Sequence, residues 1–143
     1  MKQNKFWIFV ESYHNWEQDK KNNFNLIGMD SRKLELKGIN SNDIFFTYIT
    51  KLKKFSDCRR IVSTELEETP NSVKYDKDFP TSIKTEKIKI LEINKWLNYD
   101  LIKEELEIFA TSISPQLKLL NAPILISDYD TEKLLGYMMI KNI

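Results

Sequence analysis

The sequence has very few of the residues that covalent and metal chemistry require. Its 143 residues include one cysteine, Cys58, and one histidine, His14. A single thiol cannot form an internal disulfide, and no histidine cluster offers a metal site, which fits a reducing, intracellular compartment. No second histidine can serve a serine or Cys58 as a base, so the sequence gives little support to nucleophilic catalysis.

Glycine and long apolar runs are also scarce. The three glycines, Gly28, Gly38 and Gly136, lie far apart, so the chain has no glycine-rich phosphate loop and an ATP-driven role is not expected. The apolar run at residues 6–10 is well short of a signal peptide or of the roughly 20 residues that cross a bilayer. We therefore expect a soluble, cytoplasmic protein with no membrane partner and no cofactor.

Neither sign of charge is in excess, because 22 Lys and Arg face 21 Asp and Glu. The chain lacks the whole-molecule field of many nonspecific DNA binders, so any contact with nucleic acid must be local and modest. Hydrophobic residues make up 41% of the chain and aromatic residues 12%. These values predict one folded domain over residues 1–143, and we expect it to be a monomer.

The first third of the chain predicts a strand, a helix and a loop. Aromatic and β-branched residues fill 5–11, which is typical of a strand buried on both faces near the middle of a sheet. Asn15 is an N-cap candidate with Gln18 as its capping-box partner, so a short helix is predicted from Trp16 to about Lys21. Residues 22–42 show no sustained period and are interpreted as a long, partly ordered loop.

The remainder predicts further strands, then helices. Strands are expected at 44–50, 59–65 and 83–90, with a surface loop at 67–78 and a short strand at 116–120. Asp100 is the expected cap of a helix that buries Leu101, Ile102, Leu106 and Phe109, and Ser127 that of a last helix that buries Leu134, Leu135, Met138 and Met139. The class is α+β, with a small open β-barrel of about five to six strands and three flanking helices.

Two groups of residues could contact nucleic acid. The first is a basic cluster within ten residues, expected around a turn between two strands: Lys51, Lys53, Lys54, Arg59 and Arg60. Such a cluster can hold phosphates, but lysines at turns also serve solubility and edge protection, and both interpretations stay open. The second is aromatic: Trp7, Phe9, Phe45 and Phe46 are expected in the core, whereas Tyr48 is better placed to stack on a base.

Three segments together resemble the EVE family, which has a PUA-like fold related to that of YTH domains. The first is residues 6–10 followed by Asn15-Trp16-Glu17. The second is 42–48, where Asn42 stands for a family glycine before Asp43. The third is 79–84 followed by the lysine-rich 87–90. Their order and spacing match the family over nearly the whole chain.

The resemblance implies a noncatalytic domain that binds RNA or DNA, often by closing a pocket around one modified base. It places the pocket between the first helix, the loop after it and the strand with Tyr48, where a family Trp-Gly pair becomes Ile27-Gly28. Isoleucine has no π face, which weakens stacking. The implied pocket residues are Ile27, Gly28, Met29, Ser31, Arg32, Tyr48, Ser82 and Asn121, the last in place of a family glycine. The alternative is a small-molecule or protein-interaction module that has lost the base cage.

Overall fold

The computed structural model describes residues 4–76, 79–110 and 118–143. Its centre is one open sheet with the strand order β2-β5-β4-β3-β1-β7, and β6 pairs with β4 outside this path. The strands are β1 (Phe6–Glu11), β2 (Leu26–Gly28), β3 (Ile44–Ile49), β4 (Lys54–Glu68), β5 (Thr81–Ile90), β6 (Leu97–Asn98) and β7 (Ile124–Leu125). The predicted α+β class is confirmed, and the predicted small open barrel of about five to six strands is an open, unclosed sheet of seven strands.

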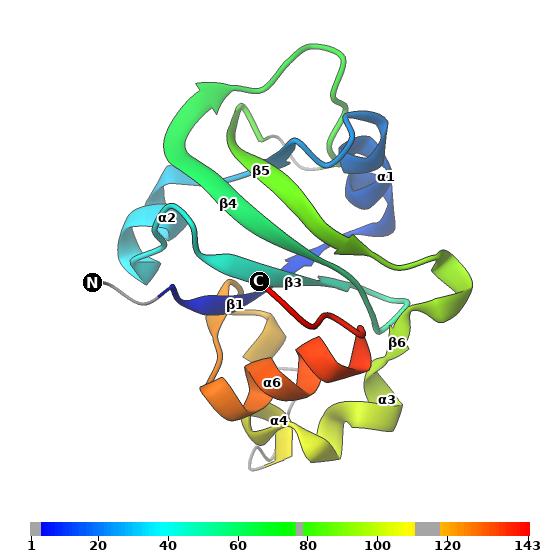
Figure 1. Ribbon diagram of the computed structural model, residues 1–143. Helices are drawn as coiled ribbons and strands as arrows, with labels where there is room; N and C mark the ends of the chain where they lie inside the picture. Colours follow the sequence, from blue (N-terminus) through cyan, green and yellow to red (C-terminus); the bar gives the residue numbers. More distant parts are fainter. Residues whose placement is uncertain (1–3, 77–78, 111–117) are drawn as a thin grey trace.

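Five helices of four or more residues lie in the described parts of the chain, more than the three predicted. They are α1 (Tyr13–Lys21), α2 (Ser31–Lys37), α3 (Tyr99–Ile102), α4 (Glu107–Ala110) and α6 (Asp128–Tyr137). Helices α3, α4 and α6 gather on one side of the sheet, while α1 and α2 lie away from them (Figure 1). Within the described residues, no helix has the length and apolar character needed to span a membrane.

Strand β1 is an interior strand, as its apolar sequence predicts. It runs parallel to β3 and antiparallel to β7. Asp43, at the start of β3, accepts hydrogen bonds from the Lys5 backbone N–H and the Trp7 Nε1, each over 3.0 Å. Asn42 before it has a φ of 72°, in the left-handed region that asparagine tolerates. The Asn42-Asp43 pair therefore fixes the start of β3 against β1.

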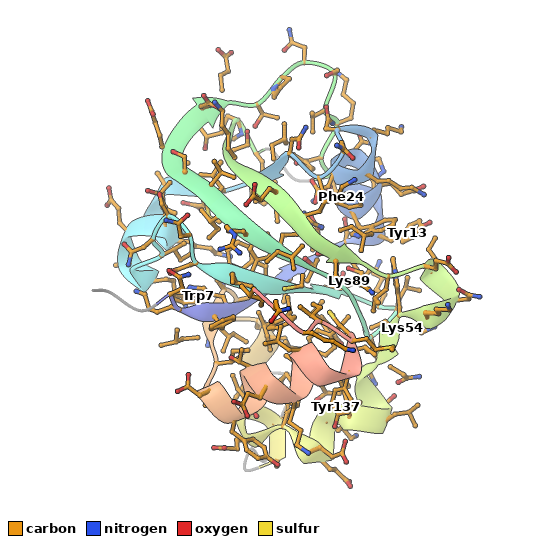
Figure 2. All side chains as sticks on the ribbon, in the orientation of Figure 1. Trp7, Tyr13, Phe24, Lys54, Lys89 and Tyr137 are labelled. Carbon is orange, nitrogen blue, oxygen red and sulfur yellow. The ribbon has the colours of Figure 1, made fainter. Side chains whose placement is uncertain are left out.

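Helix α1 begins earlier than predicted. Its cap is Ser12, whose side chain accepts a hydrogen bond from the Asn15 backbone N–H over 3.1 Å. Trp16 is buried against Phe24 and Trp96, and Figure 2 shows Phe24 beside α1. Asn15 is thus inside the helix, and its side chain is available for another partner.

The prediction of a long loop at 22–42 is wrong, because the segment contains β2 and α2. Asp30 caps α2 by accepting from the Arg32 backbone N–H over 2.7 Å, and Gly38 ends it with a φ of 75°. None of the α2 residues is fully buried. Helix α2 therefore has no amphipathic period from which it could be predicted. Its capping residues, Asp30 and Gly38, were the features of the sequence that indicated a helix here.

The C-terminal elements depart from prediction in detail. Asn98 caps α3 in place of Asp100, and Leu101 is exposed, although Ile102, Leu106 and Phe109 are buried as expected. Ser127 caps α6 as predicted, but the helix ends at Tyr137 and Met139 is exposed. The strand expected at 116–120 lies partly outside the described residues, and 118–119 are helical.

Candidate functional site

A cavity of about 270 Å³ lies where α1 meets the end of β1, β2 and the loop between β4 and β5. We call it the α1–β2 cavity. Its lining has apolar and polar members: Phe9, Val10, Glu11, Asn15, Ile27, Gly28, Met29, Asp30, Lys33, Thr50, Tyr75, Phe79, Leu119, Leu120, Ala122 and Pro123. Its volume is close to the lower limit of about 300 Å³ for ligand sites, so it suits a small ligand.

Aromatic side chains give the cavity flat surfaces. Phe9 is buried and stacks on Phe45, with ring centroids 4.1 Å apart and planes at 14°. Tyr75 and Phe79, both half-buried, come from the β4–β5 loop and meet edge to face with centroids 5.9 Å apart. Planar ligands are favoured by such faces, because aromatic rings stack on heterocycles.

The β4–β5 loop is held in place by α1. The Lys74 backbone N–H donates to Gln18 Oε1 over 3.0 Å, and the Asp76 backbone N–H donates to Asn15 Oδ1 over 2.6 Å. Ser12 Oγ donates to Asp76 Oδ2 over 2.8 Å. Helix α1 therefore positions the loop that supplies Tyr75 and Phe79.

Behind the cavity lies a buried ionic group that we call the Arg59 cluster. The guanidinium of Arg59 contacts Glu11 at 2.9 Å, Asp19 at 2.9 Å and Asp57 at 2.8 Å. The Asp19 carboxylate also accepts from the Tyr75 hydroxyl over 2.7 Å. Burying charge is costly unless it is paired and hydrogen-bonded, and here every charged member has partners.

Arg59 corrects the prediction of a phosphate-binding cluster. Its side chain has no exposed surface and is committed to three carboxylates, so it cannot reach a phosphate. The alternation of β4 explains this, because Arg59 faces α1 whereas Arg60 lies on the opposite face and pairs with Glu86 at 3.3 Å.

The other predicted basic residues are not part of the cavity wall. Lys53 lies 3.5 Å from Asp100, on the side of α3, and Lys54 pairs with Asn98 of β6. Lys51 is exposed and follows Thr50, which lines the cavity. The cavity's cationic lining residue in the described part of the chain is Lys33, from α2.

Tyr48 also differs from prediction, because it cannot stack on a base. It is 4% exposed and contacts Phe55 and Tyr99 edge to face, with centroids 5.3 Å and 5.8 Å away. Burial raises the pKa of Tyr48 to about 12. Strand β3 is buried on both faces, and Tyr48 points toward the core shared with the C-terminal helices.

The structure brings together some of the remaining predicted pocket residues. Ile27, Gly28 and Met29 line the α1–β2 cavity, whereas Ser31 and Arg32 lie on the exposed first turn of α2. Two others line separate hollows. Ser82 is buried beside Gly28 on β5, and Asn121 accepts from Lys37 Nζ at its backbone oxygen over 2.7 Å.

Sequence reasoning missed the polar and aromatic part of the site. Glu11 and Asn15 were assigned to a strand and a helix cap, and Tyr75 lies in a loop that has no period. Phe79 entered only as the first residue of the third segment that resembles the EVE family. The available signal was the presence of Tyr75 and Phe79 in an otherwise polar loop, because exposed aromatic residues mark binding surfaces.

Gly28 leaves room for Phe79, which gives a testable prediction. A Cβ at position 28 would lie 2.8 Å from Phe79 Cγ and 3.0 Å from its Cβ. We expect Gly28→Ala to displace that ring and to lower the free energy of unfolding by about 1–3 kcal/mol. Gly136→Ala is the control, because nothing lies within 4 Å of its added Cβ in α6. It should raise stability by about 0.5–1 kcal/mol in urea denaturation.

Glu11 predicts a dependence of stability on pH. Burial, followed by the neighbouring Asp19 carboxylate, raises the pKa of Glu11 well above its usual value. The folded chain therefore retains a proton that the unfolded chain releases. The resulting stabilisation is complete below the unfolded pKa of about 4.3 and is lost as the pH rises through the folded pKa.

We expect wild type to lose stability relative to Glu11→Gln as the pH rises above the unfolded pKa of about 4.3, because glutamine cannot ionise. Urea denaturation of both proteins across this range measures the difference. A difference in free energy of unfolding that does not change with pH would contradict the assignment.

Comparison with known proteins identifies the fold. No protein-family model matches the sequence, and no curated protein matches it. The described architecture is that of the YTH domains and of bacterial proteins with the same fold. The sequence identities are low, so the likeness concerns the fold.

Three solved structures illustrate the match. The YTH domain of Zygosaccharomyces rouxii MRB1, in complex with N6-methyladenosine RNA, gives a TM-score of 0.64 at 12% identity over 100% of this chain and 89% of its own. The Pho92 YTH domain in complex with m6A gives 0.64 at 15% identity over 98% and 89%. Rpa0253 from Rhodopseudomonas palustris gives 0.61 at 13% identity over 97% and 96%.

Proposed function

We propose that this chain is a noncatalytic nucleic-acid-binding domain that takes one base of RNA or DNA, plain or modified, into the α1–β2 cavity. The observation that carries the proposal is the cavity itself, which has about 270 Å³ and flat aromatic surfaces. The sequence resemblance to EVE domains and the YTH fold both support it. We expect the domain to act as a monomer in the cytoplasm.

The energetics favour a single-stranded or already extruded base. Taking a base out of a duplex costs a few kcal/mol, and stacking returns about 1–3 kcal/mol per base. The chain has a net charge of +1, so phosphate attraction adds little. Affinity for unmodified duplex should therefore be poor.

A binding role also fits the chemistry of the one thiol. Cys58 is buried on β4 and does not line the cavity. Burial raises the pKa of its thiol, which keeps it in the unreactive protonated form. This arrangement supports binding over nucleophilic catalysis.

Phosphate contacts at the cavity would come from few cations. Lys33 lines the cavity, and Lys51 is exposed beside Thr50. Each neutralised phosphate contributes about 0.7 to the slope of log affinity against log salt for a single strand. We therefore expect a weak but measurable dependence on salt.

Removal of an aromatic face tests the proposal. Phe79→Ala should weaken binding of short single-stranded RNA or DNA by about tenfold, because it removes one stacking surface of about 1–3 kcal/mol. Fluorescence anisotropy with labelled oligonucleotides, plain and base-modified, measures the affinity at several salt concentrations. Leu101→Ala is the matched control, since Leu101 is 80% exposed on α3 and outside the cavity. If no oligonucleotide binds in a salt-sensitive way, the proposal fails.

One observation favours the alternative of a small-molecule or protein-interaction module. Ile27, Leu119 and Leu120 line the cavity with aliphatic rather than aromatic surface. A nonnucleotide compound that co-purifies with the protein and is released by Phe79→Ala would support this alternative.

A further inference from the structure

The charges around the α1–β2 cavity are mainly negative. Glu11 and Asp30 line it, with Lys33 as the cation on its described wall. The Arg59 cluster behind the wall adds the carboxylates of Asp19 and Asp57 to the one guanidinium. Four carboxyl groups thus face two cationic side chains.

Glu11 connects the Arg59 cluster to the cavity. The Glu11 side chain is 7% exposed, whereas the side chains of Arg59, Asp19 and Asp57 are fully buried. Glu11 lines the cavity, whereas Arg59, Asp19 and Asp57 are not among its lining residues. It is the member of the cluster that a ligand can contact.

Asn15 supplies a second polar group at the cavity. The residue is 6% exposed and lines the cavity. Its Oδ1 accepts from the Asp76 backbone N–H, while its Nδ2 has no hydrogen-bond partner among the described residues. Because Thr69 Oγ1 is the one buried side-chain nitrogen or oxygen atom without a partner among the described residues, Asn15 Nδ2 keeps accessible surface and can donate to a ligand in the cavity.

The aromatic surfaces of the cavity suit a cation as well as a neutral ring. Phe9, Tyr75 and Phe79 present π systems, whose faces attract positive charge. With Ile27 in place of a tryptophan, stacking alone is weaker, and electrostatic attraction is the other means of holding a planar ring.

We propose that the cavity selects a positively charged, ring-methylated base, such as N1-methyladenine or 3-methylcytosine, and that Glu11 is the residue that recognises the charge. This inference rests on the proposed function, since it specifies the base that the same cavity accepts. Asn15 Nδ2 would donate to an acceptor on the ring.

Binding of a cationic base should depend on pH through Glu11. The titratable groups around Glu11 are Arg59 and Asp57 from β4, Asp19 from α1 and Tyr75 from the β4–β5 loop, with Asp30 and Lys33 elsewhere on the cavity wall. Burial and the Asp19 carboxylate raise the pKa of Glu11, so a lower pH favours its neutral form, which attracts a cation less than the carboxylate does. Affinity for the charged base should therefore rise with pH until the base itself loses its proton.

Isomeric bases give a matched test. N1-methyladenine and N6-methyladenine have the same composition, but only the first is cationic at neutral pH; 3-methylcytosine and 5-methylcytosine form a second such pair. We would place each base at the centre of a single-stranded RNA and a single-stranded DNA pentamer and measure affinity by calorimetry. We expect the cationic isomer of each pair to bind about tenfold more tightly.

Glu11→Gln should remove this preference, because it keeps an acceptor for Arg59 and loses the charge. Glu17→Gln is the control, since Glu17 is exposed on α1 and outside the cavity; it should keep the preference. If Glu11→Gln does not fold, the wild-type isomer comparison and its pH dependence decide the matter. Equal binding of the isomers, a reversed order, or a preference that survives Glu11→Gln overturns the inference alone. No binding of any pentamer, modified or plain, overturns the proposed function too.

Discussion

Replacement of Arg59 by methionine is expected to lower the free energy of unfolding by about 3–5 kcal/mol. Methionine fills similar volume but leaves the carboxylates of Glu11, Asp19 and Asp57 buried without their cation. Like charges in a dry interior repel one another and lose hydration. Urea or thermal denaturation at neutral pH measures the loss.

The neighbouring arginine provides the control. Arg60→Met removes a partly exposed ion pair with Glu86, and such pairs contribute about 0–1 kcal/mol. The two variants make the same chemical change on adjacent residues of β4. Equal losses of stability would mean that the carboxyl groups around Arg59 are hydrated, and that the cluster is not the buried network described above.

Trp16→Ala is expected to cost about 3–5 kcal/mol. Trp16 is 2% exposed, and its ring lies 4.9 Å from Trp96 and 5.6 Å from Phe24. Its Nε1 also donates to Asp57 over 2.9 Å. The substitution removes this packing and one of the hydrogen bonds that stabilise the buried Asp57. Because α1 holds the β4–β5 loop, ligand binding should be lost as well.

Trp16→Phe separates the two contributions. Phenylalanine keeps most of the aromatic contact and removes the indole donor, so its cost should reflect mainly the hydrogen bond to charged Asp57, about 1.5–3 kcal/mol. Unfolding and oligonucleotide binding would be measured in parallel. A Trp16→Ala protein of wild-type stability would show that α1 is not anchored through this side chain.

The strongly apolar strands could be predicted from sequence. The very short strand and the strand of mixed polarity could not. Residues 5–11 and 44–50 predicted β1 and β3 closely, because both are buried on two faces. Strand β2 has three residues and α2 has no fully buried one, so neither produces a period. Strand β4 extends beyond the predicted 59–65. Its ends were missed because its register shifts at several places and interrupts the alternation of side chains.

The residues of the site also fall into a group that could be predicted from sequence and a group that could not. Ile27, Gly28 and Met29 could be placed through family resemblance, since they follow in order after the first strand and helix. Arg59 could not be told from Arg60 without the register of β4, and Tyr48 could not be assigned a face on a strand buried on both sides. Tyr75 reaches the cavity through hydrogen bonds with α1, more than 50 residues away in sequence, and no local pattern reports such a contact.

The parallel pairing of β1 with β3 has a consequence for how the chain folds. Phe6 pairs with Ile44 and Ile8 with Phe46, so this register joins residues 38 positions apart, and the antiparallel partner of Ile8 is Ile124. Contacts between distant residues form late, because the intervening chain must first be ordered. During synthesis, the aromatic β1 segment emerges before either of its neighbours exists. An unpaired aromatic segment of this kind is open to misassociation while translation proceeds.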